Sequence, residues 1–200
     1  MTLQLTPLST ADIREAAALH LRSFPSFFLS ELGERFLREF YRGFLDDGAI
    51  TAIARDEDGR LLGVVVGHME PAGFFRRLLR RRWYAFGLAS LSLVIRRPSV
   101  LPRIARAVTY RGQAGRTPQS GALLSSICVD PQEQGAGTGR KLLTSFTDEL
   151  ARRGGARAYL TTDAAANESA NAFYLSAGWH HEEAFLTPEG RRMNCYVWLA

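Results

Sequence analysis

The sequence predicts a mixed α/β fold, in which a central sheet of about seven strands is flanked by helices. Three observations lead to this prediction. Short apolar runs of strand character alternate with segments of helical periodicity along most of the chain. Two pairs of strand-like runs are each joined by turn-forming residues, as in hairpins. One apolar run is followed at once by a glycine-rich loop and a helical pattern. The 200 residues, 46% of them hydrophobic, are expected to form a single domain with a full core.

The first part of the chain predicts a strand, two helices and a hairpin. Residues 3–8 alternate as a strand does, and Ser9 or Thr10 is a suitable cap for a helix that ends near residue 22. Residues 26–45 predict a second helix. Residues 49–55 and 61–70 form the hairpin, turned by D-E-D-G. The apolar residues of the second helix fall on one face, which predicts their burial: Leu32, Phe36, Leu37, Phe40, Tyr41 and Phe44.

The second part of the chain alternates strands and helices and then closes with another hairpin. The predicted order is strand 122–129, helix 137–153, strand 156–163, helix 167–177, and hairpin strands 179–185 and 191–199. Residues 71–122 stand apart as an insertion between the third and fourth strands.

Residues 129–143, V-D-P-Q-E-Q-G-A-G-T-G-R-K-L-L, predict a phosphate-binding loop. Glycine lets the backbone approach a ligand closely, and the N–H groups of a first helical turn attract an anion such as a pyrophosphate. The spacing of Gly135, Gly137 and Gly139 is not the G-x-G-x-x-G of dinucleotide-binding loops. A Walker loop is excluded as well, because Gly139 is followed by Arg140 and Lys141 and no hydroxyl is present for magnesium. The alternative is a tight connection without a ligand.

Two motifs in the expected order resemble the signatures of the GNAT superfamily of N-acetyltransferases. Gln134-x-x-Gly137-x-Gly139 resembles the Q-x-x-G-x-G loop of that family. Residues 167–179, N-E-S-A-N-A-F-Y-L-S-A-G-W, resemble its second signature, N-x-x-A-x-x-F-Y-x-x-x-G-[FW]. The order of strands and helices also resembles the GNAT fold everywhere except in residues 71–122. Taken alone, the second motif is equally an amphipathic helix capped by Asn167, with Tyr174 in the core.

The resemblance implies an acyltransferase that binds acetyl-coenzyme A between two splayed strands. The backbone of Ile127, Cys128 and Val129 would then hold the pantetheine arm, and Asn167 would contact the same arm. The pyrophosphate would lie on the loop and the first helical turn, whose residues are Gln134, Gly135, Ala136, Gly137, Thr138, Gly139 and Arg140.

The implied chemistry is direct transfer of an acetyl group to a primary amine. Tyr174 matches the tyrosine with which the family protonates the departing thiolate, and a phenol is a suitable acid for that step. Two candidates for the base that deprotonates the amine, His68 and Glu70, lie near the end of strand 61–70 and share one face of it. The alternative interpretation is that both side chains simply extend into solvent at the end of the strand. Ser125 and Ser126 could relay protons through water.

Residues 71–122 carry eleven arginines and no acidic residue, so this insertion has a charge of +11 while the remainder has −6. Residues 74–97 predict an amphipathic helix followed by an uncharged stretch that is shorter than the roughly 20 residues of a membrane span. Three interpretations remain. The insertion is a solvated helical flap, a lining of the acceptor site that favours an anionic amine, or a peripheral contact with anionic lipid.

Composition limits the metal sites, cellular locations and partners that we expect. Cys128 and Cys195 lack the spacing of a disulfide framework or a zinc site, so we expect no metal and a reducing, cytoplasmic location. The N-terminus lacks the pattern of a signal peptide. We expect no nucleic-acid partner, because the basic stretch lacks repeated aromatic platforms.

We expect the acceptor to be a small-molecule or peptide amine, and the chain to be a monomer or a homodimer. Longer-chain N-acyl transfer and a non-catalytic acyl-coenzyme A-binding, membrane-surface module are the alternative functions.

Overall fold

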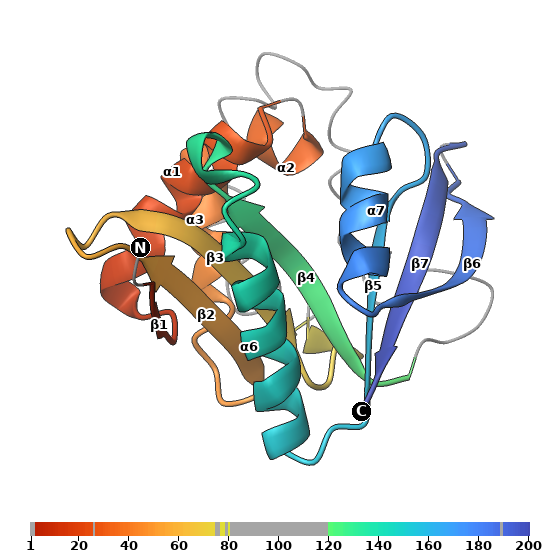
Figure 1. Cartoon of the computed structure of the whole chain (residues 1–200). Helices are drawn as coiled ribbons and strands as arrows, with labels where there is room; N and C mark the ends of the chain where they lie inside the picture. The colour runs from red at the N-terminus through yellow and green to blue at the C-terminus, as the bar shows by residue number, and fades with distance from the viewer. Residues whose placement is uncertain (1–2, 26, 75–76, 79, 81–119, 189) are drawn as a thin grey trace.

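A computed structural model describes residues 3–25, 27–74, 77–78, 80, 120–188 and 190–200. Its elements follow the predicted order, as Figure 1 shows. They are β1 (Gln4–Thr6), η1 (Thr10–Asp12), α1 (Ile13–Ser23), α2 (Phe28–Glu31), α3 (Glu34–Arg42), β2 (Ala49–Arg55), β3 (Leu61–His68), β4 (Ala122–Val129), η3 (Pro131–Glu133), α6 (Thr138–Arg152), β5 (Arg157–Asp163), α7 (Glu168–Ser176), β6 (His180–Leu186) and β7 (Arg192–Leu199).

The strands form one mixed sheet of seven strands in the order β1-β2-β3-β4-β5-β7-β6, which confirms the predicted fold class. The β4 and β5 strands run parallel, and the other neighbouring strands of this sheet are antiparallel. The ladder between β4 and β5 contains only two pairs, Ala122 with Ala158 and Leu123 with Tyr159. Beyond them the two strands diverge, and the resulting V-shaped separation is visible in Figure 1.

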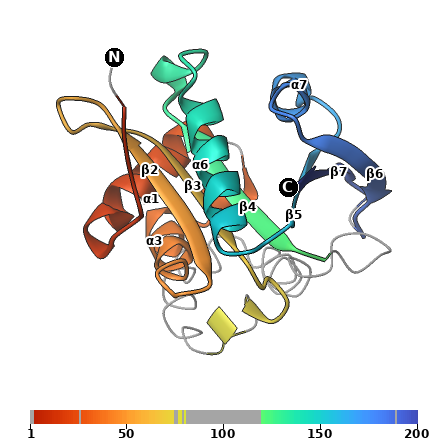
Figure 2. The ribbon, with the colours of Figure 1, turned by 60° about the horizontal axis from the view of Figure 1, so that its bottom comes forward.

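Helices cover both faces of the sheet and enclose two hydrophobic clusters. Helices α1 and α3 lie on one face, while α6 and α7 lie on the other (Figure 2). On the α1 face, Leu37 and Val66 are fully buried, and on the α6 face Phe146 and Val65 are. Burial of a side chain of this size stabilises the fold by about 1.5–3 kcal/mol. The alternation of Val65 and Val66 between the clusters follows from the two-residue period of a strand.

The second predicted helix, residues 26–45, is wrong as a single element. Its predicted apolar face is buried as expected, from Leu32 at 3% exposure to Phe44 at 1%. However, α2 ends at Glu31 and α3 begins at Glu34, because Gly33 has a φ of 86° and interrupts the helical path. A positive φ of this kind is accessible to glycine at little cost. The apolar spacing therefore predicted which side chains are buried but missed the interruption.

Candidate active site

The loop after β4 forms an open cradle at the N-terminus of α6. Gly135 and Gly137 have φ values of 85° and 84°, and a Cβ atom added to either would meet no other atom within 4 Å. Gly137 caps α6, so the N–H groups of the first turn, at Thr138, Gly139 and Arg140, have no acceptor within the helix. These N–H groups and the positive end of the helix dipole make the cradle suitable for a pyrophosphate.

Arg140 is held beside this cradle by the end of α7. Its guanidinium donates to the carbonyl oxygen of Ser176 at 3.0 Å and to the Ser176 hydroxyl at 3.1 Å. A cation at the C-terminal end of a helix is also favoured by the helix dipole. The contact therefore joins α6 to α7 and fixes a positive charge at the border of the pocket, whose lining includes Arg140.

The free edge of β4 presents backbone groups to the gap between β4 and β5. The Asp130 N–H donates to the Leu62 carbonyl at 2.8 Å, so alternate residues of β4 turn their backbone groups toward β3. Ile127 and Val129 lie between those residues and turn theirs to the gap. The Val129 carbonyl accepts a hydrogen bond from Ser23 at 3.0 Å. The backbone carbonyl of Cys128 faces β3 and not the gap, because it lies against Gly63.

A pocket of about 1010 Å³ occupies this gap. Its lining includes most of the predicted binding residues, namely Ile127, Val129, Gln134, Gly135, Gly137, Gly139, Arg140, Asn167 and Tyr174. Three predicted residues, Cys128, Ala136 and Thr138, are not part of the lining. Because side chains from both hydrophobic clusters line the pocket, it reaches both faces of the sheet.

Helix α7 brings Tyr174 into the pocket wall. The side-chain amide of Asn167 donates to the Thr162 hydroxyl at 2.7 Å and to the Asp163 carbonyl at 3.1 Å. These hydrogen bonds connect the start of α7 to the end of β5. Tyr174 is 8% exposed, and its ring packs 5.7 Å from that of Tyr196. Burial raises the pKa of the Tyr174 phenol far above its usual value, and nearby Cys128 and Tyr196 raise it further. The phenol therefore remains a proton donor throughout the neutral range.

The structure does not bring His68 and Glu70 to the pocket. His68 is paired with Leu123, at the closed end of the gap. Its ring is 3% exposed, packs 4.3 Å from the ring of Phe74, and lies 3.4 Å from a carboxylate oxygen of Asp46. Glu70 is exposed beyond the end of β3, and its N–H donates to His68 Nδ1 at 2.9 Å. Neither residue lines the pocket.

A polar group that the sequence did not reveal lies in the pocket wall on the α1 face. His20, on α1, lines the pocket, and its Nδ1 lies 3.0 Å from the Tyr41 hydroxyl and 3.5 Å from the Cys128 sulfur. Ser126 lines the same wall, and its hydroxyl is 3.5 Å from the Cys128 sulfur. His20 and Tyr41 each lie on the apolar face of their own helix, but only the packing of α1 against α3 makes them neighbours.

A bulge in β4 places Ser125 at the start of the divergence. Val66 pairs with Ser126, whereas Gly67 pairs with Leu124, which leaves Ser125 as the extra residue. Its hydroxyl oxygen is buried and has no hydrogen-bond partner in the part of the chain that the structure describes. Since Ser125 also lines the pocket, this hydroxyl is a polar group available to a ligand.

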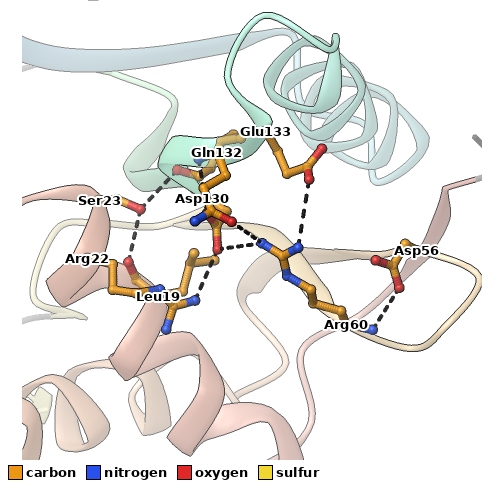
Figure 3. A network of polar contacts seen from close by, with 9 residues as sticks. Leu19, Arg22, Ser23, Asp56, Arg60, Asp130, Gln132 and Glu133 are labelled. Atoms are coloured by element: carbon orange, nitrogen blue, oxygen red, sulfur yellow. Dashed lines mark hydrogen bonds and ion pairs between the residues drawn. The ribbon is translucent and has the colours of Figure 1, made fainter.

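Asp130 anchors the cradle to α1 and to the β2–β3 turn, as Figure 3 shows. Its carboxylate pairs with Arg22 at 3.2 Å and Arg60 at 3.4 Å, and it accepts a hydrogen bond from the Gln132 N–H at 3.1 Å. Although burial raises the pKa of Asp130, the Gln132 N–H, Arg22 and Arg60 together hold it below its usual value. The carboxylate is therefore charged at neutral pH and fixes the entry to the phosphate loop.

A match to a family model decides the class of the protein. The model of the Acetyltransferase (GNAT) family matches residues 13–179. The chain belongs to the GNAT family. It is therefore an acyltransferase, and the matched residues include both motifs that resemble the family signatures.

Solved structures of low sequence identity share this fold. The ribosomal-protein-S18-alanine N-acetyltransferase from Escherichia coli aligns over 99% of this chain and 94% of its own, with 17% identity and a TM-score of 0.61. The NatC complex bound to Gag peptide and CoA aligns over 100% and 99%, with 15% identity and a TM-score of 0.61. A spermidine N-acetyltransferase SpeG chimera from Vibrio cholerae and hSSAT covers 100% and 96%, with 16% identity and a TM-score of 0.61. No curated protein matches the chain in sequence.

Most of the arginine-rich insertion lies outside the described residues. The predictions for residues 74–97, including contact with a membrane surface, therefore stay predictions, as does a cytoplasmic location. Phe74 is described and is 3% exposed, with its ring 5.0 Å from that of Phe44. Among the described residues, no helix is both long enough and apolar enough to span a bilayer.

Proposed function

We propose that this protein transfers an acetyl group from acetyl-coenzyme A to a primary amine. One observation carries the proposal, namely a pocket that runs from an open phosphate cradle, past a buried phenol, to the opposite face of the sheet. A donor that enters from the α6 side can then meet an acceptor that enters from the α1 side. The spermidine and ribosomal-protein acetyltransferases that share the fold also act on amines.

The residues of the α6 side suit the donor. The cradle at Gly135 and Gly137 has space and backbone N–H groups for a pyrophosphate. The free backbone groups of Ile127 can pair with an amide of a pantetheine arm, as an added strand would. A thioester at the end of this arm would lie beside Tyr174, and the Val129 N–H is a suitable donor for its oxyanion.

The environment of Cys128 favours direct transfer over an acyl-enzyme intermediate. Burial raises the pKa of the Cys128 thiol to about 11, although hydrogen bonds with Ser126 and Tyr41 oppose the shift. The thiol is consequently neutral at pH 7 and is a poor nucleophile. Amine attack on the thioester carbonyl forms the amide C–N bond and breaks the C–S bond, and Tyr174 protonates the departing thiolate. The proton that the amine loses returns through water to the Tyr174 oxygen, which restores the phenol.

Release of free coenzyme A with a panel of primary amines tests this proposal. We expect amine-dependent release of the thiol from acetyl-coenzyme A and formation of the acetylated amine, measured by mass spectrometry. The same panel with an octanoyl donor distinguishes acetyl transfer from longer-chain acyl transfer. Tight acetyl-coenzyme A binding without turnover on any amine would contradict the proposal and favour a non-catalytic binding module.

A further inference from the structure

The half of the pocket on the α1 face has an apolar wall that the donor site does not use. Ile127 and Val129, on the proposed acetyl-coenzyme A side, pack against the hydrophobic cluster of the α6 face, as does Phe173 of α7. In contrast, Phe24 and Phe185 pack against the cluster of the α1 face. Since the pocket passes between β4 and β5, a thioester in the gap exposes its other side to this second half. The amine that attacks it must approach from there.

Two separate parts of the chain form this wall. Pro25 ends α1 and turns the chain, which leaves Phe24 and Phe27 with ring centroids 5.6 Å apart at the pocket. On the opposite side, Phe185 of β6 and Met193 of β7 are direct cross-strand partners. Both lie in the pocket lining, as do Leu29 and Leu123. The wall, defined here as Phe24, Phe27, Leu29, Leu123, Phe185 and Met193, is thus aromatic and aliphatic.

The charged groups next to this wall are engaged with each other. Arg191 donates to both carboxylate oxygens of Asp163, at 2.7 Å and 2.6 Å, and the two side chains lie in the pocket lining. The same guanidinium lies 5.9 Å from the centre of the Phe27 ring. A bidentate pair of this kind presents little net charge to a ligand. Beside the polar side chains of His20 and Ser126 on this face, the described lining therefore offers an acceptor mainly the apolar wall.

We infer that the acceptor is a primary amine whose amine-bearing end carries an aromatic or branched aliphatic group. This inference rests on the proposed acetyl transfer and specifies its acceptor. A free arylalkylamine and a peptide with an apolar first residue share this chemistry. Transfer of one side chain of this size from water into an apolar wall corresponds to a gain of about tenfold to a hundredfold in kcat/KM.

A series of amines at fixed acetyl-coenzyme A tests the inference. We expect phenylalaninamide and leucinamide to exceed glycinamide, aspartate α-amide and spermidine in kcat/KM by about tenfold to a hundredfold. Phenylethylamine and a tetrapeptide with N-terminal Phe separate a small amine from a peptide end, because the better of the two identifies the source. Fastest turnover with spermidine or with the acidic amine would overturn the inference but leave acetyl transfer intact.

Truncation of Phe27 tests the wall itself. Phe27 is 40% exposed, so Phe27→Ala is expected to fold normally, which circular dichroism can verify. The variant should lose about tenfold in kcat/KM for phenylalaninamide, with unchanged values for glycinamide and an unchanged KM for acetyl-coenzyme A. Leu186→Ala is the matched control, because Leu186 is 68% exposed and is not in the lining. An equal loss for both amines, or none, would overturn the assignment of the wall. Absence of coenzyme A release with every amine would instead contradict the proposed function.

Discussion

Tyr174 is the residue whose environment best matches a chemical role. The residue is only 8% exposed and lies in the pocket wall. Tyr196 lies 5.7 Å away between ring centroids, and its hydroxyl donates to Asn171 at 2.9 Å. Of these two buried phenols, only Tyr174 lines the pocket, so only Tyr174 is placed to give a proton to a leaving group.

Tyr174→Phe should lower kcat by about a hundredfold, because a general acid typically contributes that factor or more. The KM for acetyl-coenzyme A should change little, since the phenyl ring keeps its packing. Tyr196→Phe, a matched loss of one buried hydroxyl, should keep kcat while it lowers stability by about 1 kcal/mol. Steady-state kinetics and urea unfolding of both variants provide the measurement. An unchanged kcat in Tyr174→Phe would remove its assignment as the acid.

Single residues also mark the limit of prediction from the sequence. The motif spacing located Tyr174 and the glycines, because the loop and helix that hold them are local structures. It could not locate His20, whose neighbours Tyr41 and Cys128 come from distant parts of the chain. The alternation of side chains along β3 correctly predicted the face of the sheet on which His68 lies. It could not predict that His68 lies at the closed end of the gap, because the register of β3 with β4 determines that position.

At the scale of elements, the phosphate loop combines two different requirements for glycine. Gly137 has a φ of 84° and open space around its Cβ position, so alanine there is strained by the backbone alone. Gly139 has no positive φ, and a Cβ atom would lie 3.4 Å from Phe173 and 3.5 Å from Val129. The first glycine is needed for the turn, and the second keeps the space between the loop and α7 open.

Alanine substitutions should separate these requirements. Gly137→Ala should lose about 1–2 kcal/mol of stability, and Gly139→Ala should lose almost none but bind acetyl-coenzyme A about tenfold more weakly. Gly154→Ala is the control for strain, since its φ of 79° and open surroundings resemble those of Gly137 but it lies outside the pocket lining. Thermal unfolding and isothermal titration calorimetry measure the two effects. Gly154→Ala should match the stability loss of Gly137→Ala, and an unchanged affinity in Gly139→Ala would contradict the role given to the second glycine.

Asp130 links α1, the β2–β3 turn and the phosphate loop, so its charge should contribute to stability. Asp130→Asn keeps an oxygen for the Gln132 N–H but loses both ion pairs, which should cost about 2 kcal/mol at pH 7. Salt should reduce this cost, because Arg22 and Arg60 are 54% and 48% exposed.

The pH dependence of this cost follows from the direction of the pKa shift. The folded protein holds the pKa of Asp130 below its usual value of 3.8, so the stabilisation is complete above pH 4 and is lost as the pH falls through the lower folded pKa. Urea unfolding of both proteins should therefore show a gap at pH 7 that narrows below pH 4. A gap as large at pH 2.5 as at pH 7 would indicate that the charge is not its cause.

The elements of the C-terminal half were predicted within one or two residues, and the reason is physical. Proline, glycine and capping residues bound each element there, as with Pro131 before the loop and Gly178 after α7, where φ is 85°. In the other half, Gly33 was hidden inside an uninterrupted apolar pattern. Most of residues 71–122 lies outside the described residues, so the predictions for the insertion rest on its charge and apolar spacing alone.

At the scale of the whole molecule, the sheet consists of two parts joined by a short ladder. The β1–β4 part and the β5–β7–β6 part meet at only two residue pairs between β4 and β5. Contacts such as Arg140 with Ser176 add to the connection from the helix layer. A ligand that lies along the open edge of β4 would contact both parts at once. Ligand binding should therefore protect the gap as well as stabilise the fold.

Acetyl-coenzyme A at a hundred times its Kd should raise the free energy of unfolding by about 2.7 kcal/mol. Amide hydrogen exchange at Ile127 and Val129 should slow by more than global stabilisation alone would cause, because their backbone groups face the gap. The control ligand is 3′-phospho-ADP, which has the phosphates but no pantetheine arm. At the same multiple of its own Kd it should stabilise the fold equally, yet leave these two amides with only the global protection. Equal local protection by both ligands would place the pantetheine arm outside the gap. The direct transfer proposed across the sheet would then have no structural basis.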